Sequence, residues 1–179
     1  MNPAHWVFDK LYPAIRFNYE RLQGHRWFDE IIPDLWVGGA PTYDRDRQFL
    51  LDNGITAVLD MRAERTGPTE FYAAHDIAYH QIPVLDVMVP EKEQLANAVD
   101  WVGEQMDGGR TVLVHCAKGR GRSAIVVAAT LMRRQDLSYD EARELMESKR
   151  PLTKLETRHR QRITEYVSTH AEDATHDQH

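Results

Sequence analysis

The chain has 179 residues, a length at which a single domain can bury a full hydrophobic core. Hydrophobic residues make up 42% of it and charged residues 28%, ordinary values for a globular protein that exclude a disordered or collagen-like chain. The formal net charge of -6 gives the phosphate backbone of a nucleic acid no general reason to bind. We therefore expect one folded domain and no nucleic-acid partner.

Cysteine usage and hydropathy predict where the protein works. Cys116 is the single cysteine, so no disulfide can form within the chain and a reducing compartment is expected. The longest apolar run, residues 124–132, is shorter than the roughly 18 residues needed to cross a bilayer. Asp9, Lys10 and Arg16 interrupt the start of the chain, which argues against a secretory signal. We expect a cytoplasmic protein.

The first 22 residues place large apolar side chains at helical spacing between charged ones. This pattern predicts an amphipathic helix that is interrupted or bent at Pro13, within an N-terminal extension of residues 1–26. We expect the helix to pack on the domain. The alternative is peripheral contact with a membrane surface.

From residue 27 onward, predicted strands and helices alternate. Short apolar runs predict strands at residues 35–37, 55–59, 79–84 and 111–114. Helices are predicted at residues 43–52, 91–105, 123–134, 138–149 and 154–168, the fourth opened by a capping box of Ser138 and Glu141. The order predicts an α/β domain over residues 27–168, with a central, mainly parallel sheet flanked by helices. Residues 169–179 are expected to form a disordered polar tail.

The most informative segment is His115–Ser123, which follows the last predicted strand and opens a helix. In open α/β sheets, ligands bind at the carboxyl ends of the strands. A loop of small residues entering a helix turns backbone N–H groups toward one point, which makes an anion site. The candidate phosphate-binding residues are Ala117, Lys118, Gly119, Arg120, Gly121 and Arg122.

Cys116 is predicted at the floor of this loop. The donors that bind an anion, together with Arg122, are expected to lower the pKa of its thiol and stabilise the thiolate. A thiolate beneath a phosphate site favours nucleophilic attack on phosphorus, with Arg122 donating two hydrogen bonds to the transferring group. The segment therefore predicts a phosphatase.

The same segment resembles the H-C-x-x-G-x-x-R-S signature of the dual-specificity branch of the protein tyrosine phosphatase superfamily, and the resemblance spans residues 27–167. It implies the dual-specificity phosphatase fold and a phosphocysteine intermediate on Cys116. It further implies that Arg122 clamps the phosphate, that Ser123 stabilises the leaving thiolate and that His115 orients the loop through hydrogen bonds. This chemistry requires no cofactor and no metal, and the nine histidines form no convincing metal set.

The reaction also needs a proton for the leaving group. Asp86 follows a predicted strand and precedes the next helix, where the family places its acid loop, so it is our candidate for the general acid. Asp60, at the end of the strand predicted at residues 55–59, is the rival. The apolar residues at positions 85 and 87–89 are expected to desolvate the Asp86 carboxyl partly and help it to stay protonated.

Within the superfamily, the turn at residues 37–41 and the basic loop residues Lys118 and Arg120 resemble the branch typified by a mitochondrial phosphatidylglycerophosphate phosphatase. Two departures are Ala117, where that family often has lysine, and residues 150–154, where an asparagine-containing turn is usual. The expected substrate is therefore a phosphotyrosine, phosphoserine or phosphothreonine protein. The alternative, which the sequence leaves open, is an acidic phospholipid, either phosphatidylglycerophosphate or a phosphoinositide.

Two other classes of function are alternatives to a phosphatase. A non-catalytic phosphate-binding module would not need both Cys116 and Asp86. A rhodanese-like sulfur transferase also places a cysteine loop before a helix, but the pair Arg122 and Ser123 favours phosphate. A Cys-dependent phosphomonoesterase is thus the favoured interpretation.

Overall fold

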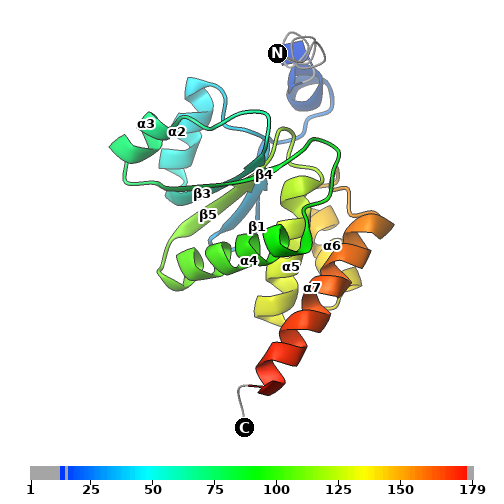
Figure 1. Cartoon of the computed structure of the whole chain (residues 1–179). Helices are drawn as coiled ribbons and strands as arrows, with labels where there is room; N and C mark the ends of the chain where they lie inside the picture. Colours follow the sequence, from blue (N-terminus) through cyan, green and yellow to red (C-terminus); the bar gives the residue numbers. More distant parts are fainter. Residues whose placement is uncertain (1–12, 15, 177–179) are drawn as a thin grey trace.

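A five-stranded sheet forms the centre of the protein, as seen in a computed structural model that describes residues 13–14 and 16–176 (Figure 1). The strands are β1 (Phe28–Ile32), β2 (Leu35–Gly38), β3 (Ile55–Arg62), β4 (Ala78–Val84) and β5 (Thr111–His115). Their order is β1-β2-β5-β3-β4, with β1 antiparallel to β2 and the other neighbouring pairs parallel. The predicted α/β fold with a mainly parallel sheet is confirmed.

Helices cover both faces of the sheet (Figure 1). Short elements lie on one face, and four longer helices on the other. The elements are η1 (Asn18–Leu22), α2 (Asp44–Asp52), α3 (Thr69–Ala74), α4 (Lys92–Asp107), α5 (Arg122–Gln135), α6 (Tyr139–Lys149) and α7 (Thr157–His176).

Strand β5 shows why the sheet is apolar on both faces. Successive side chains of a strand point to opposite faces. Val112 and Val114 belong to the core beneath α4 and α5, whereas Leu113 packs in the second core with Leu50 of α2 and Tyr72 of α3. A continuous apolar run is therefore required here, as the sequence predicted.

The predicted strands and helices are present, with boundaries shifted by a few residues. The capping box is confirmed: the Ser138 hydroxyl accepts from the Glu141 N–H at 3.3 Å, and the Glu141 carboxylate accepts from the Ser138 N–H at 2.8 Å. Strand β1 and helix α3 were not predicted from the sequence. The last helix is longer than predicted: α7 continues to His176, through residues that were expected to form a disordered tail.

The predicted N-terminal helix lies partly outside the described residues. In the part that is described, Arg16 is buried and donates two hydrogen bonds to the Asp46 carboxylate, at 2.6 and 2.5 Å. Its guanidinium also lies 4.4 Å from the ring centroid of Trp27. These contacts hold Arg16 against α2 and against Trp27, the residue before β1. No helix in the described residues is long and apolar enough to cross a membrane.

Candidate active site

The loop at residues 116–121, here called the phosphate loop, connects the carboxyl end of β5 to α5. All its carbonyl groups from residue 117 to residue 121 accept hydrogen bonds from outside the loop or from the following helix. The pairs are Ala40 N to the carbonyl of Ala117 at 3.3 Å, Arg150 Nη2 to that of Lys118 at 3.0 Å, Arg150 Nε to that of Gly119 at 2.8 Å, Lys154 N to that of Arg120 at 2.8 Å and Ile125 N to that of Gly121 at 3.0 Å. Since these carbonyls are held outward, the N–H groups between them point toward the centre of the loop, where an anion can bind.

Gly119 allows the loop to take this path. Its φ is +66°, in the left-handed region that L side chains rarely adopt. A Cβ at this position would also overlap the backbone of Gly38 at the end of β2. The loop therefore needs glycine here in order to lie against the sheet.

Cys116 lies buried at the floor of the loop, as predicted. Its sulfur accepts from the Gly119 N–H at 3.3 Å and from the Ser123 hydroxyl at 3.5 Å. Burial by itself raises the pKa of the thiol, but the charge of Arg122 and the hydrogen bonds from Ser123 outweigh burial and lower the pKa below its ordinary value. The site thus favours the nucleophilic thiolate.

Arg122 is held across the loop by a residue that the sequence analysis missed. Its Nη1 and Nη2 atoms donate to the two carboxylate oxygens of Glu64, at 2.7 and 2.8 Å. The Val84 carbonyl also accepts from Nη1, at 2.9 Å. Burial raises the pKa of Glu64, but the hydrogen bond and the charge of Arg122 lower it by more, so the pKa lies below its ordinary value. Glu64 therefore stays ionised and orients the guanidinium.

Asp86, the candidate acid, is brought to the site by the loop between β4 and α4. Its Oδ1 atom accepts from Arg122 Nη2 at 2.9 Å, and it lines the same cavity as Cys116. The expected desolvation is wrong, however. Leu85, Val87 and Met88 are 69%, 72% and 53% exposed, so they face solvent and do not cover the carboxyl group.

The rival acid, Asp60, lies in an environment typical of a residue that supports the fold. It is buried in β3, where it accepts from Arg62 Nε and Nη2 at 2.8 and 2.7 Å. Burial raises the pKa of Asp60, but His115 and Arg62 lower it below its ordinary value, so the group is an ionised partner of Arg62. Asp60 does not line the cavity that contains Cys116.

His115 is buried between Asp60 and the phosphate loop. Its Nδ1 atom lies 3.4 Å from the Cys116 carbonyl oxygen, and its Nε2 atom lies 3.8 Å from Asp60 Oδ2. Burial lowers the pKa of His115 to about 4, although Asp60 opposes this effect. The neutral ring fits the predicted orienting role.

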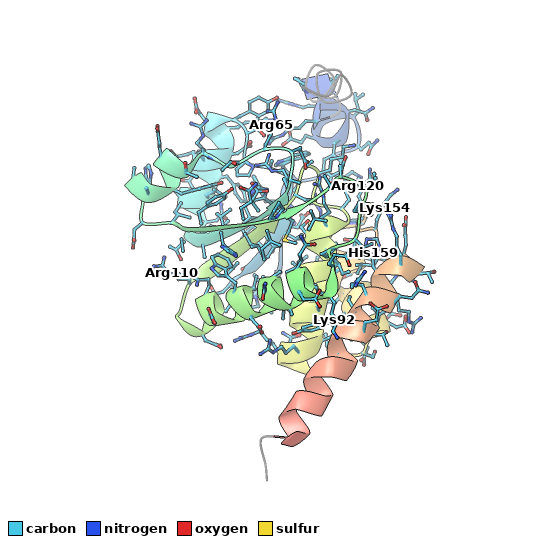
Figure 2. The ribbon with its side chains drawn as sticks, viewed as in Figure 1. Arg65, Lys92, Arg110, Arg120, Lys154 and His159 are labelled. Carbon is cyan, nitrogen blue, oxygen red and sulfur yellow. The ribbon has the colours of Figure 1, made fainter. Side chains whose placement is uncertain are left out.

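A cavity of about 190 Å³ opens above Cys116. The connection between α6 and α7 and the first turn of α7 supply a wall that the sequence analysis did not predict (Figure 2). The residues of this wall are Lys154, Glu156, Arg158 and His159. Their separation in sequence from the signature left no local pattern to reveal them.

His159 presents a neutral ring to the cavity. Its Nδ1 atom accepts from the Glu156 N–H at 3.0 Å, which leaves the proton on Nε2. Burial lowers the pKa of this imidazole, and its Nε2 atom lies beside Gly121. Among the residues that the structure describes, no cluster of three histidine, cysteine or acidic side chains is placed to hold a metal ion.

A buried cysteine beneath an anion-binding loop, with an arginine at the loop's end and an aspartate at its mouth, defines the class of Cys-based phosphatases. The family model for the catalytic domain of dual specificity phosphatases matches residues 35–169. The chain belongs to this family, and it is a phosphoric monoester hydrolase.

Relatives within the family differ in their named substrates. The chain is 30% identical over 161 residues to the phosphatidylglycerophosphate phosphatase PTPMT2 of Arabidopsis thaliana, covering 87% of this chain and 70% of that protein. It is 32% identical over 129 residues to human dual specificity protein phosphatase 12, covering 70% of this chain but only 37% of the relative.

Solved structures share the fold. The structure of Tk-PTP in its active form superposes with a TM-score of 0.70 at 25% identity, covering 78% of this chain and 95% of that one. PTPMT1 in complex with PI(5)P gives a TM-score of 0.76 at 22% identity, covering 83% of this chain and 99% of that one.

Proposed function

We propose that the protein is a phosphatase of acidic phospholipids, which hydrolyses the terminal phosphomonoester of a head group such as that of phosphatidylglycerophosphate. The observation that carries this proposal is the charge of the cavity wall. Five cations and two carboxylates line it, in a chain whose net charge is -6. The cations are Lys118, Arg120, Arg122, Lys154 and Arg158, and the carboxylates are Asp86 and Glu156.

Apolar side chains stand beside these cations. Leu85, Val87 and Met88 project from the loop that carries Asp86, and Val87 and Met88 line the cavity itself. Exposed apolar side chains gathered in this way commonly mark an interaction surface. A rim of cations and apolar groups suits a phosphorylated head group at the surface of an anionic bilayer.

The small size of the cavity supports the same assignment. Pockets that enclose a whole small molecule are typically about 300 to 1,000 Å³, whereas this one is about 190 Å³. It therefore admits the phosphoryl group and its nearest atoms, and the remainder of the substrate lies across the rim.

The geometry supports a two-step mechanism. The Cys116 thiolate attacks phosphorus, the ester oxygen leaves with a proton from Asp86, and a phosphocysteine forms. Arg122 and the N–H groups of the phosphate loop stabilise the equatorial oxygens. Water then attacks phosphorus and gives a proton to the Asp86 carboxylate. Inorganic phosphate forms, and the departing thiolate accepts the Ser123 hydrogen bond.

The contact between Asp86 and Arg122 fits this sequence of steps. A phosphate dianion that binds the guanidinium competes with Asp86 for Nη2, because the oxygen atoms of both groups accept hydrogen bonds from the same donor. Glu64 keeps its own two contacts and so holds the guanidinium in place. Substrate binding thereby releases Asp86 toward the leaving oxygen.

A phosphoprotein phosphatase is the second candidate. The resemblance to human dual specificity protein phosphatase 12 over 70% of this chain favours it. The two candidates share the same nucleophile and clamp, so they differ only in what the rim recognises.

A substrate panel tests the proposal. It contains phosphatidylglycerophosphate and phosphoinositides in vesicles, together with phosphotyrosine, phosphoserine and phosphothreonine peptides. We expect the highest kcat/KM on a lipid, and no turnover by Cys116→Ser on any substrate although that variant still binds phosphate. Higher kcat/KM on the peptides would overturn the lipid assignment, and turnover by Cys116→Ser would overturn the mechanism.

A further inference from the structure

Two cations at the rim of the cavity lack a carboxylate partner. Arg122 pairs with Glu64 and Asp86, and Arg158 pairs with Glu156 at 3.1 Å. Within the described part of the chain, the exposed side chain of Lys154 makes no hydrogen bond or ion pair. The charge of Lys154 is therefore available to a ligand.

Arg120 is the second of these cations. Its Nε atom donates to the Leu152 carbonyl at 3.3 Å, and its guanidinium forms no ion pair with any described residue. A carbonyl takes up one donor of a guanidinium that has five. The remaining donors of Arg120 are therefore available at the rim.

These two residues are fixed next to each other. The Lys154 N–H donates to the Arg120 carbonyl at 2.8 Å, so the connection between α6 and α7 is bonded to the phosphate loop at this point. Both residues line the cavity above Cys116. Figure 2 shows Arg120, Lys154 and His159 on the same side of the molecule, near the first turn of α7. The cations thus form one local positive surface beside the phosphoryl site.

We propose that Lys154 and Arg120 form a second anion subsite, which binds the phosphodiester of a lipid head group while the terminal phosphomonoester occupies the phosphate loop. This assignment rests on the proposed function and specifies what the rim recognises. A phosphodiester keeps one negative charge at neutral pH. An arginine and a lysine supply it with charge-assisted hydrogen bonds, which are stronger than neutral ones.

The carboxylates around the subsite do not cancel it. Asp86 and Glu156 face the same cavity, but Glu156 already pairs with Arg158, and Asp86 carries the proton for the leaving oxygen once the phosphate has displaced it from Arg122. The subsite is therefore expected to distinguish ligands by their number of phosphates. A ligand with one phosphate uses the loop alone, whereas a ligand with two gains contacts to Lys154 and Arg120.

Competitive inhibition of p-nitrophenyl phosphate hydrolysis tests the subsite with soluble compounds. Glycerophosphoglycerophosphate carries a phosphodiester and a phosphomonoester, and glycerol 3-phosphate carries the monoester alone. For Lys154→Met, we expect the inhibition constant of the first compound to rise about three- to tenfold, with that of the second changed less than about twofold. Lys154→Arg should restore tight binding of the first compound.

Lys92→Met is the matched control, since Lys92 opens α4 and does not line the cavity. It should leave both inhibition constants unchanged. Added salt should weaken binding of the two-phosphate compound more in the wild type than in Lys154→Met, because the variant has lost one of the screened contacts.

Several outcomes would overturn the subsite. One is an equal rise of both inhibition constants in Lys154→Met, which would place Lys154 in the phosphoryl site. The others are unchanged inhibition constants in Lys154→Met, or wild-type protein that binds the two compounds equally well. The inhibition assay does not require lipid turnover, so failure of the subsite is separate from failure of the lipid substrate in the panel above.

Discussion

Arg150 donates from Nη1 to Asp29 Oδ2 at 2.5 Å, and both side chains are buried. Nε and Nη2 of the same guanidinium donate to the Gly119 and Lys118 carbonyls of the phosphate loop. Strand β1 and the end of α6 therefore jointly fix two consecutive peptide groups of the loop. Removing this support should disturb phosphate binding more than it disturbs the rest of the fold.

The first prediction concerns Arg150→Lys. An ammonium cannot reproduce a fork that reaches two carbonyls and a carboxylate at once. We expect kcat/KM to fall about tenfold or more, because loosened peptide groups no longer present their N–H donors to the phosphate. The pKa of Cys116 should also rise, and the rate of iodoacetamide alkylation against pH measures it.

Arg16→Lys is the control for this variant. Arg16 is equally buried and also pairs with an aspartate, Asp46, but it does not contact the phosphate loop. Both variants should lower Tm, and only Arg150→Lys should shift the alkylation curve. A fall in Tm without that shift would show that Arg150 supports the fold alone.

The second prediction concerns Asp86→Asn. An amide cannot give a proton to the leaving oxygen, so esters with alkyl leaving groups should slow by about 10²- to 10⁴-fold. Aryl esters such as p-nitrophenyl phosphate should slow much less, because their leaving groups depart without protonation. A comparison of kcat across a series of leaving groups measures this. A uniform loss would assign the acid role to another residue.

The strands and helices predicted from the sequence are correct where a local sequence pattern alone determines the structure. Val112 and Val114 form an apolar run that only a covered strand accommodates, and Ser138 with Glu141 marks a helix start from two side chains alone. The loop around Cys116 was also predictable, because its glycines and its position between a strand and a helix are adjacent in sequence.

The supports of that loop were not predictable, because they depend on tertiary contacts. Glu64 and Arg122 are 58 residues apart in sequence, and Asp29 and Arg150 are 121 residues apart. No periodicity encodes such pairs. The expected shielding of Asp86 failed for a related reason: apolar residues predict burial only if another element covers them, and no described element covers Leu85 or Val87.

The third prediction concerns stability against pH. The pKa of His115 is about 4 in the folded protein because of burial, against about 6.5 in an unfolded chain. The unfolded chain therefore binds the proton more readily, so this contribution to stability is complete above about pH 6.5 and is lost as pH falls toward about 4. The loss at His115 should be at most about 3 kcal/mol.

Denaturant unfolding at several pH values measures this effect. His115→Asn should flatten the dependence in that window, leaving the smaller contribution of His159, whose pKa burial also lowers. Asp60 affects stability only at lower pH. Because its pKa is lowered, its contribution to the free energy of unfolding disappears only in stronger acid than the range in which His115 titrates. An unchanged slope in His115→Asn would show that His115 does not resist protonation in the fold.

The fourth prediction concerns deletion of residues 1–22. The deletion removes Arg16 and leaves the buried Asp46 with only the longer, 4.0 Å ion pair to Arg45, which is strongly destabilising. Activity on a soluble ester and activity on lipid in anionic vesicles should therefore fall together, along with Tm. Loss of the vesicle activity alone would instead assign the extension to a membrane surface.

The last prediction concerns oxidation. The lowered pKa of Cys116 favours a thiolate, which peroxide converts to a sulfenic acid. A neighbouring thiol often protects such a species as a disulfide, but the chain has no second cysteine. The sulfenic acid must then react with a backbone nitrogen, an external thiol or further peroxide, and the last route gives a sulfinic acid that is ordinarily irreversible.

Brief exposure to peroxide should therefore be reversed by dithiothreitol, and longer exposure should leave inactive protein with two oxygen atoms added at Cys116. Bound phosphate should slow both stages, because it covers the sulfur at the floor of the loop. Peptide mass spectra taken beside activity recovery measure this. Full recovery after prolonged exposure, or inactivation with Cys116 unmodified, would contradict a reactive thiolate, since a low thiol pKa and the absence of a second cysteine together leave the sulfur open to further oxidation.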